Sequence, residues 1–366
     1  MHFGDQRGNE GPLSSFLDVL SVIKATIFGL VMTAYTWVLA NLSNMNRASG
    51  TSVPVEHSII NKTFNLRNGS LKITDFLAEG GFSFVYSGVF NNERCAVKQI
   101  ITHDTVSHVT SEIKILETLS VGHPNCVSLL ASHVPPAPSS ALLVFPFLPK
   151  NLKNLINDTR PPSRDTNIES VPELDMREIS RIAVEIARTL EYVHSMNIAH
   201  LDIKPDNVLM DNGRPLLTDF GSATSNIKRS VEGRNESLML WDYCQQNCTV
   251  SYRAPELFED GCRGGEIDLR LGDVWSFGGV VFAMYFGESP FECEYDRMGR
   301  GVKIVECGFL RTLGRGWMQE QRKGRLGERW KEYLRVKPVV EACLKERGER
   351  REMSGIVAML EGEGGV

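Results

Sequence analysis

The sequence lacks the dense, regular cysteine spacing of a disulfide-rich secreted domain. Its eight cysteines are scattered over 366 residues, which favours a reducing compartment for most of the chain. It also lacks a strong net charge, and a formal charge of −5 gives no reason to expect nucleic acid as a partner. It is not poor in apolar residues, so disorder is not expected. The length suits one two-lobed domain with an extension, or two small domains.

Long apolar stretches without charge are rare here, and one near the N-terminus stands out. It runs from Ala25 to Ala40, which is at the short end of the roughly 20 residues that span a bilayer. Tyr35 and Trp37 lie toward one end, where interfacial aromatic residues are expected. We therefore interpret residues 25–42 as a candidate membrane helix. A cleaved leader and a helix packed on the domain remain alternatives, although acidic residues before the stretch count against a leader.

The pattern after residue 66 changes from strands to helices along the chain. Short apolar runs between Leu71 and Ile100 are broken by glycine and by Asn91-Asn92, which predicts a β-meander. Ser111 to Ser120 has helical spacing, and Arg177 to Ser195 keeps its apolar residues on one helical face. A small β-rich part followed by a larger helical part predicts an α+β, bilobal fold.

The strongest local motif is Ile198-Ala199-His200-Leu201-Asp202-Ile203-Lys204-Pro205-Asp206-Asn207. Asp202 is suited to orient an acceptor hydroxyl and take its proton, and Lys204 to neutralise a transferring phosphoryl group. Asn207 and, twelve residues later, Asp219 supply the hard oxygen ligands that Mg²⁺ prefers. The order and spacing of these residues predict a protein kinase fold that uses ATP and Mg²⁺.

Upstream residues supply the other parts that phosphoryl transfer needs. Leu77 to Val85 predicts a Gly-rich loop in which Gly80, followed by Gly81, lets the backbone approach the phosphates. Ala96-Val97-Lys98 follows at strand spacing, so Lys98 would contact the α- and β-phosphates with Glu112 as its ion-pair partner. A simple hairpin and a surface Lys–Glu pair are the alternatives.

Val144 to Leu148 fits the segment that binds adenine between two lobes. Phe145 would be the gatekeeper, and Pro146 lacks an N–H but needs only to offer its carbonyl. Leu148 would both donate and accept a hydrogen bond. With Leu77, Val85 and Ala96, these residues complete the predicted ATP site.

Residues further along predict an activation segment and its supports. Thr249 stands five residues before Ala254-Pro255-Glu256, where its hydroxyl would meet Asp202 and favour Ser/Thr acceptors. Glu256 needs a buried cation, for which Arg351 is the candidate, a surface pair being the alternative. Asp273 would brace the backbone of the catalytic loop, which also contains His200. Cys244 and Cys248 stand four apart, but no second pair at metal-ligand spacing accompanies them.

Several segments together resemble the numb-associated kinase group, and within it the myristoylated and palmitoylated serine/threonine kinases. The segments are Glu79 to Ser83, Asp219 to Thr224, Glu236 to Tyr243, Cys248 to Phe258, Val274 to Phe277 and Ala283 to Phe291. The resemblance covers Leu71 to Met353. It implies a Ser/Thr kinase, with some Tyr activity conceivable, at Golgi or secretory membranes, and a helix around Ser237 to Gln246 in the activation segment.

Three departures from that group have consequences. His2 follows the initiator Met, so no glycine is available there for N-myristoylation. Residues 25–42 could serve as the membrane anchor instead. Leu201 replaces an Arg that pairs with an activation-segment phosphate, which predicts activity independent of that phosphorylation. Ala78 and Ser83 replace two glycines of the Gly-rich loop, which weakens the expectation of tight nucleotide binding.

The predicted organisation has four parts. They are an N-terminal tail (1–24), the candidate membrane helix (25–42), a linker (43–66) and a kinase domain (67–362) with lobes 67–147 and 148–362. ATP and reduced cysteines place residues after 47 in the cytosol if the helix spans a membrane; a cytoplasmic protein is the alternative. A protein with a Ser/Thr hydroxyl is the expected substrate. A pseudokinase or a membrane-tethered scaffold is the rival interpretation, motivated by the departures above.

Overall fold

The computed structural model describes most of the chain after residue 58. The described residues are 59–79, 83–102, 106–136, 139–161, 171–258, 265–291, 293–295, 301–303 and 326–362. The chain separates into two compact units, Met1–Ile60 and Asn61–Val366, and the account below concerns the second. The predicted membrane helix at 25–42 lies outside the described residues. Among the residues that are described, no helix is both long and apolar enough to cross a bilayer.

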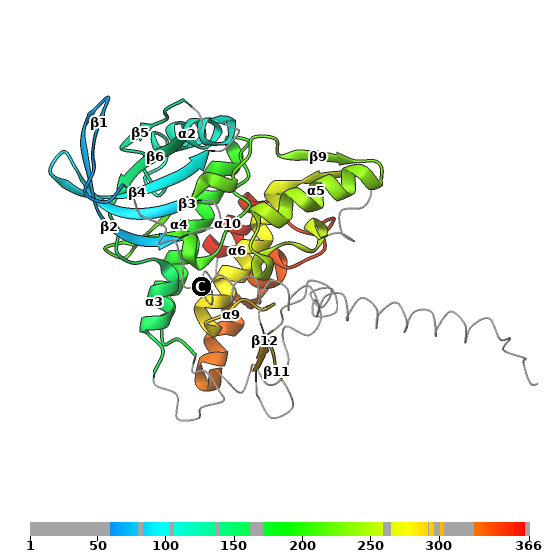
Figure 1. Ribbon diagram of the computed structural model, residues 1–366. Coiled ribbons are helices and arrows are strands. Elements are labelled where there is room, and N and C mark those ends of the chain that lie inside the picture. Colours follow the sequence, from blue (N-terminus) through cyan, green and yellow to red (C-terminus); the bar gives the residue numbers. More distant parts are fainter. Residues whose placement is uncertain are drawn as a thin grey trace, which may run out of the picture. The chain divides into compact units, whose positions relative to one another are not determined.

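A six-stranded antiparallel sheet with the order β1-β2-β3-β4-β6-β5 forms the first part of this unit (Figure 1, blue to green). Its strands are β1 (Thr63–Leu66), β2 (Gly69–Glu79), β3 (Ser83–Phe90), β4 (Glu93–Thr102), β5 (Ala131–His133) and β6 (Ser139–Pro146). The β-meander predicted between Leu71 and Ile100 is confirmed, because β2, β3 and β4 pair in succession. Asn91 and Asn92 make the tight β3–β4 turn, and both adopt the left-handed backbone conformation that asparagine tolerates.

Helix α2 (Val106–Ser120) lies between β4 and β5 in the chain, and it carries Glu112. Leu116 and Leu119, one turn further along α2, are buried. On the sheet, Val97 and Leu143 are also fully buried. Leu116, Leu119 and Leu143 belong to one buried apolar cluster, and the i, i+4 spacing of Glu112 and Leu116 turns the Glu112 carboxylate toward the protein interior.

The second part of the unit is mostly helical. Its helices are α3 (Leu152–Asp158), α4 (Met176–Ser195), α5 (Arg234–Asn247), α6 (Leu269–Phe286), α9 (Trp330–Cys343) and α10 (Met353–Glu361). The helix predicted at 177–195 is confirmed as α4, whose N-terminus is capped by the Asp175 carboxylate accepting from the Arg177 and Glu178 amides. Nearly every side chain of α6 is buried, as expected for the central helix of a globular core.

Three pairs of short strands lie between the helices of the second part. They pair as β7 (Val208–Asp211) with β8 (Arg214–Leu217), β9 (Lys228–Val231) with β10 (Gly265–Asp268), and β11 (Cys293–Tyr295) with β12 (Gly301–Lys303). The helix predicted around residues 237–246 is present as α5, and it lies beside β9 in Figure 1. The β9–β10 pairing joins segments more than thirty residues apart, and sequence reasoning did not predict it.

The predicted pairing of Glu256 with Arg351 is wrong, because Arg350 takes that place. Arg350 Nη1 and Nη2 donate to the two carboxylate oxygens of Glu256 at 2.5 and 3.0 Å. Arg350 also donates to the carbonyls of Leu271 and Lys345, and its guanidinium lies 5.0 Å from the Trp275 ring centroid. Arg351 is exposed. Arg350 lies in the turn that follows α9, where its amide donates to the Glu346 carbonyl at 3.0 Å; Met353, the first residue of α10, comes only after this turn.

Replacing Arg350 with Ala should therefore destabilise the protein far more than replacing Arg351. The first change leaves a buried carboxylate without its cation, which costs about 3–5 kcal/mol, whereas an exposed side chain changes stability by about 0.5 kcal/mol or less. Denaturant unfolding of both variants measures the difference. Equal free energies of unfolding for the two variants would contradict the assignment.

Candidate active site

A cleft of about 840 Å³ collects most of the predicted nucleotide-binding residues. Its walls come from β2, β3, β4, the end of β6, the catalytic loop and the activation segment. The predicted residues that line it are Leu77, Val85, Ala96, Lys98, Phe145, Pro146 and Leu148, together with Glu112, Lys204, Asn207, Asp219 and Thr249. Gly80 and Gly81 lie outside the described residues. The volume is in the range of pockets that hold small-molecule ligands.

The segment after β6 offers backbone groups to the cleft. Phe145 and Pro146 pair with Ala96 and Cys95 at the end of the β4–β6 ladder, so the missing N–H of Pro146 falls where the ladder stops. The next side chain, Phe147, stacks under the Arg94 guanidinium at 3.7 Å. Within the described part of the chain, the N–H and C=O of Leu148 form no backbone hydrogen bond, which leaves both for a planar base.

Lys98 joins the sheet, helix α2 and the activation segment through its ammonium group. Nζ lies 2.8 Å from Glu112 Oε1 and 2.8 Å from Asp219 Oδ1. Burial opposes the charge, but Asp219 and Glu112 outweigh it and raise the pKa of Lys98. Burial likewise acts to raise the pKa of Asp219, and Lys98 overcomes it and holds that pKa below its ordinary value. Both groups are therefore charged at neutral pH.

Gly221 is required by this cluster. A Cβ at that position would stand 2.9 Å from Lys98 Nζ and 3.3 Å from Asp219 Oδ1. Lys98 is held by two carboxylates and cannot move aside without loss of one of them. Asp219 itself has a φ of 61°, a backbone conformation that non-glycine residues rarely adopt and that occurs at functional sites.

Asp202 lies at the centre of a compact hydrogen-bond network. Thr249 donates its hydroxyl and its amide to Asp202 Oδ1 at 2.6 and 3.0 Å. Lys204 Nζ lies 2.8 Å from Asp202 Oδ2 and also donates to Thr249 Oγ1 at 2.8 Å. Asn207 Nδ2 donates to the carbonyl of Asp202 and to Oδ2. Because its Nδ2 is used in this way, the amide oxygen of Asn207 is the atom left to bind a metal.

The backbone before Asp202 is held by the buried carboxylate of Asp273. Oδ2 accepts from the amide of His200 at 2.8 Å and Oδ1 accepts from the amide of Leu201 at 2.8 Å. Leu201 has a φ of 70°, a strained conformation that these bonds support. His200 in turn packs on Phe220 with ring centroids 4.8 Å apart, and its Nε2 lies 3.0 Å from the Thr218 carbonyl.

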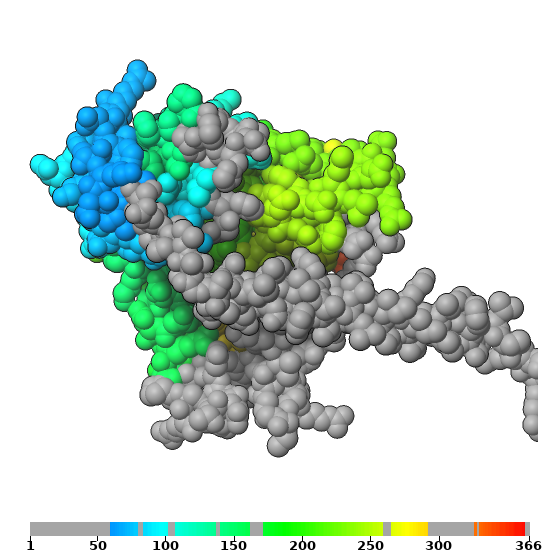
Figure 2. Space-filling view, in the orientation of Figure 1, coloured from blue at the N-terminus to red at the C-terminus, as the bar shows by residue number. Residues whose placement is uncertain are grey.

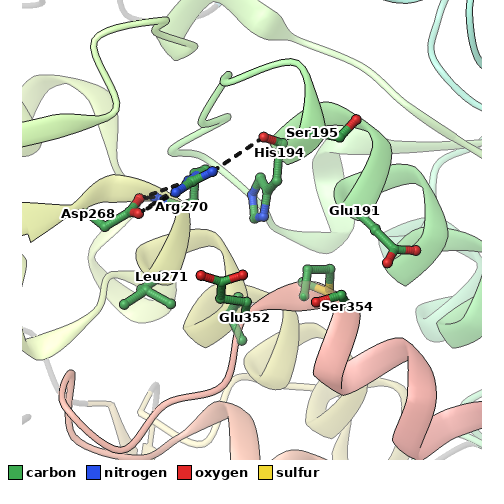
Figure 3. Close-up of a pocket in the computed structure, with 10 residues that line it drawn as sticks. Glu191, His194, Ser195, Asp268, Arg270, Leu271, Glu352 and Ser354 are labelled. Carbon is green, nitrogen blue, oxygen red and sulfur yellow. Dashed lines mark hydrogen bonds and ion pairs between the residues drawn. The ribbon is translucent and has the colours of Figure 1, made fainter.

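His194 was not singled out in the sequence, yet it belongs to the same support. Its Nε2 lies 2.9 Å from Asp273 Oδ2. His194 also lines a second hollow, of about 230 Å³, between α4, the start of α6 and α10 (Figure 3). There Arg270 is paired with Asp268 and donates to the His194 carbonyl. The hollow contains none of the predicted nucleotide-binding residues, so we treat it as part of the support of the catalytic loop.

The activation segment is ordered by contacts that need no phosphate. Strand β9 pairs with β10, and Lys228 forms an ion pair with Glu266 at 2.7 Å. Arg229 lies over the Tyr243 ring of α5, 4.9 Å from its centroid. Leu201, where an Arg could bind a phosphate, is buried.

The chain belongs to the protein kinase family, because the protein kinase domain family matches residues 69–351. Serine/threonine-protein kinase 16 of Mus musculus is 35% identical over 232 residues, which covers 60% of this chain and 71% of that protein. The protein of the same name from Homo sapiens is 35% identical over 228 residues with the same coverage. A probable serine/threonine-protein kinase of Dictyostelium discoideum is 26% identical over 321 residues, covering 68% of this chain and 84% of that protein. The chain is thus a serine/threonine protein kinase, which implies use of ATP and a divalent metal.

Replacing Thr249 with Val should lower kcat by roughly ten-fold or more, whereas Thr249→Ser should preserve it. Val keeps the shape but removes the hydroxyl that orients Asp202 and Lys204, and small misplacements of catalytic groups are costly. Steady-state kinetics at saturating ATP would measure both variants. Equal kcat values for the Val and Ser variants would show that the hydroxyl has no such role.

Removal of phosphate from the activation segment should leave activity within about two-fold of its starting value, because Leu201 cannot bind a phosphate there. The measurement is initial rate before and after treatment with a protein phosphatase, with phosphate content followed by intact mass. Loss of most of the activity on dephosphorylation would refute this prediction.

Proposed function

We propose that this kinase transfers the γ-phosphate of ATP·Mg²⁺ to Ser/Thr hydroxyls of proteins, with Asp202 as the residue that orients the acceptor hydroxyl and takes its proton. The observation that carries the proposal is the Thr249 hydroxyl, which donates to Asp202 Oδ1 at 2.6 Å while it accepts from Lys204. An aliphatic hydroxyl thus already lies against Asp202 within the protein. A substrate hydroxyl would be bound by the same two types of group.

The residues present fit the nucleotide and its metal. Asp219 and the free amide oxygen of Asn207 are hard oxygen donors of the kind that Mg²⁺ prefers. When bound, the metal neutralises charge on the phosphates and holds them in line for transfer. Lys98, kept in place by Glu112, supports the α- and β-phosphates, and Lys204 faces the position of the transferred group. Leu148 would bind the adenine edge through its backbone, with Leu77, Val85 and Ala96 above and below the ring.

Finer assignments rest on the sequence. We place the chain in the numb-associated kinase group because of the segments around Asp219 and Cys248 to Phe258 described above. We also propose that residues 25–42 attach it to a membrane of the Golgi or secretory pathway, with the kinase domain in the cytosol. The support is the apolar composition of that segment.

Phosphoryl transfer should disappear when either Asp202 or Asp219 is replaced with Ala. Loss of a positioned acid–base group typically costs about 10²–10⁴-fold in rate. The assay is transfer of labelled γ-phosphate from ATP·Mg²⁺ to a generic protein substrate by the full chain. Nucleotide binding, followed as a rise in Tm, should persist in Asp202→Ala because that residue does not contact the base. A folded parent that binds ATP but transfers nothing to a panel of substrates would favour a scaffold instead.

Deletion of residues 1–47 should release the protein from membranes without loss of activity. The reason is that the apolar segment is removed while every residue of the catalytic site is retained. Sedimentation of both chains with secretory-membrane vesicles is the measurement. If the shortened chain sediments as well as the full chain, residues 25–42 are not the anchor.

A further inference from the structure

Two cysteines of the activation segment lie against each other at the end of α5. Cys244 is in the last turn of the helix, and Cys248 is its C-terminal cap. Both are free thiols and both are buried. The Cys248 amide donates to the Cys244 carbonyl at 3.0 Å, so the two residues lie one helical turn apart. The outer side of α5 is at the surface (Figure 2, yellow-green), where Met239 is 73% exposed.

Two arginines next to this pair have hydrogen-bonding capacity left over. Arg253 is only 4% exposed, and one of its terminal nitrogens donates to the Cys248 carbonyl at 2.7 Å. Among the described residues, its Nε and Nη1 are buried with no partner, and so is Nε of Arg229. A buried cation without a counter-charge is costly, and it stabilises any anion that forms beside it. The local chemistry therefore favours a negative charge on sulfur.

The electrostatic environment shifts the pKa values of the two thiols in opposite directions. The neighbouring Cys248 side chain lowers the pKa of Cys244, against the effect of burial, and Arg253 and Arg229 lower it further. The Cys244 side chain and burial raise the pKa of Cys248. The buried thiols of Cys126 and Cys343 have no such partner, and burial raises the pKa of each to about 12. Of these four thiols, Cys244 is the one whose pKa is lowered, and the thiolate is the nucleophilic form of cysteine.

The spacing also permits a disulfide. Residues one helical turn apart have Cα atoms about 6 Å apart, which lies within the range that a disulfide bridges. A disulfide holds its two Cβ atoms about 3.8 Å apart with a defined dihedral angle. Cys244 is held within α5, whereas Cys248 lies at the end of the helix in an extended conformation, with φ −128° and ψ 130°. Bond formation would therefore act on the position of Cys248.

Such a movement would reach the catalytic residue directly. Thr249 is bonded to Cys248 and donates both its amide and its hydroxyl to Asp202 Oδ1. Because a hydrogen bond weakens steeply as its length and angle depart from the ideal, a shift of Cys248 would weaken both of these bonds. Lys204, which donates to the Thr249 hydroxyl, would lose that partner as well.

We propose that Cys244 and Cys248 form a peroxide-sensitive thiol pair that inactivates the kinase by displacing Thr249 from Asp202. The Cys244 thiolate attacks one oxygen of a hydroperoxide, so that an S–O bond forms, the O–O bond breaks, and hydroxide or alkoxide leaves and takes up a proton. The Cys248 sulfur then attacks the resulting sulfenic acid. An S–S bond forms, the S–O bond breaks, and water leaves with the thiol proton. The two thiols lose two electrons, the peroxide gains them, and a dithiol reductant reverses the change.

The first experiment treats the full chain with hydrogen peroxide and follows activity and mass together. We expect a fall in activity of roughly ten-fold or more, a Cys244–Cys248 linkage in the peptide map, and recovery with dithiothreitol. Cys126 and Cys343 should remain alkylatable after unfolding, as internal controls. The activity readout rests on the proposed role of Asp202, but the peptide map does not, so failure of one is distinguishable from failure of the other. Oxidation that joins Cys244 to any other cysteine, or none at all, would overturn the proposal.

Two variants separate the steps. Cys244→Ala should keep its basal activity and lose its sensitivity to peroxide. In Cys248→Ala the sulfenic acid has no thiol to attack it, so Cys244 should be labelled by a cyclic 1,3-dione. Unchanged sensitivity of Cys244→Ala, with Cys343→Ala as the matched control, would refute the mechanism. Absence of dione labelling in Cys248→Ala would show that Cys244 is not the residue that reacts with peroxide.

Discussion

The position of Asp202, the residue proposed to be catalytic, depends on one buried carboxylate, that of Asp273. It is fully buried, and a buried charge is tolerated only where several donors surround it. The donors here are the His194 ring and the amides of His200 and Leu201. Because α6 is itself buried on nearly all sides, the carboxylate is fixed by the core. The core thus holds the strained backbone of Leu201 and fixes the position of the Asp202 backbone next to it.

The activation segment, which contacts Asp202, is also held in place by protein contacts alone and needs no phosphate. Where an arginine would add a positive charge that needs a counter-ion, Leu201 adds a buried apolar side chain. The segment is held instead at three places. Lys98 binds Asp219 at its start, Thr249 binds Asp202 near its end, and Arg350 binds Glu256 where it leaves the site. Each of these contacts is built from residues always present, so the arrangement around Asp202 is available as soon as the chain folds.

Most of the candidate site could be predicted from the sequence because its residues belong to short motifs with fixed spacing. Asp202, Lys204 and Asn207 lie on one loop, so their meeting is nearly a local event. Lys98 with Glu112 could be paired because one follows the other by a strand end and one helix turn. Choices decided by packing were harder. Arg350 and Arg351 are chemically the same, and only the fold of the turn between α9 and α10 distinguishes them. Strand β9, with the sequence Lys-Arg-Ser-Val, has no alternation to mark it, and its partner comes more than thirty residues later.

The three contacts of the activation segment differ in how easily each can be altered. Of the two outer contacts, the pair of Arg350 with Glu256 is buried, and separating it leaves a buried charge unpaired. The contact between Thr249 and Asp202 also includes a charge, but Lys204 and Asn207 would continue to satisfy the Asp202 carboxylate if Thr249 moved. Displacing Thr249 therefore costs less than breaking the pair of Arg350 with Glu256, while it acts on the residue proposed to orient the acceptor hydroxyl. A regulatory change is most effective where it loses little folding free energy and has a large effect on activity. The thiol pair next to Thr249 lies at that point of the segment.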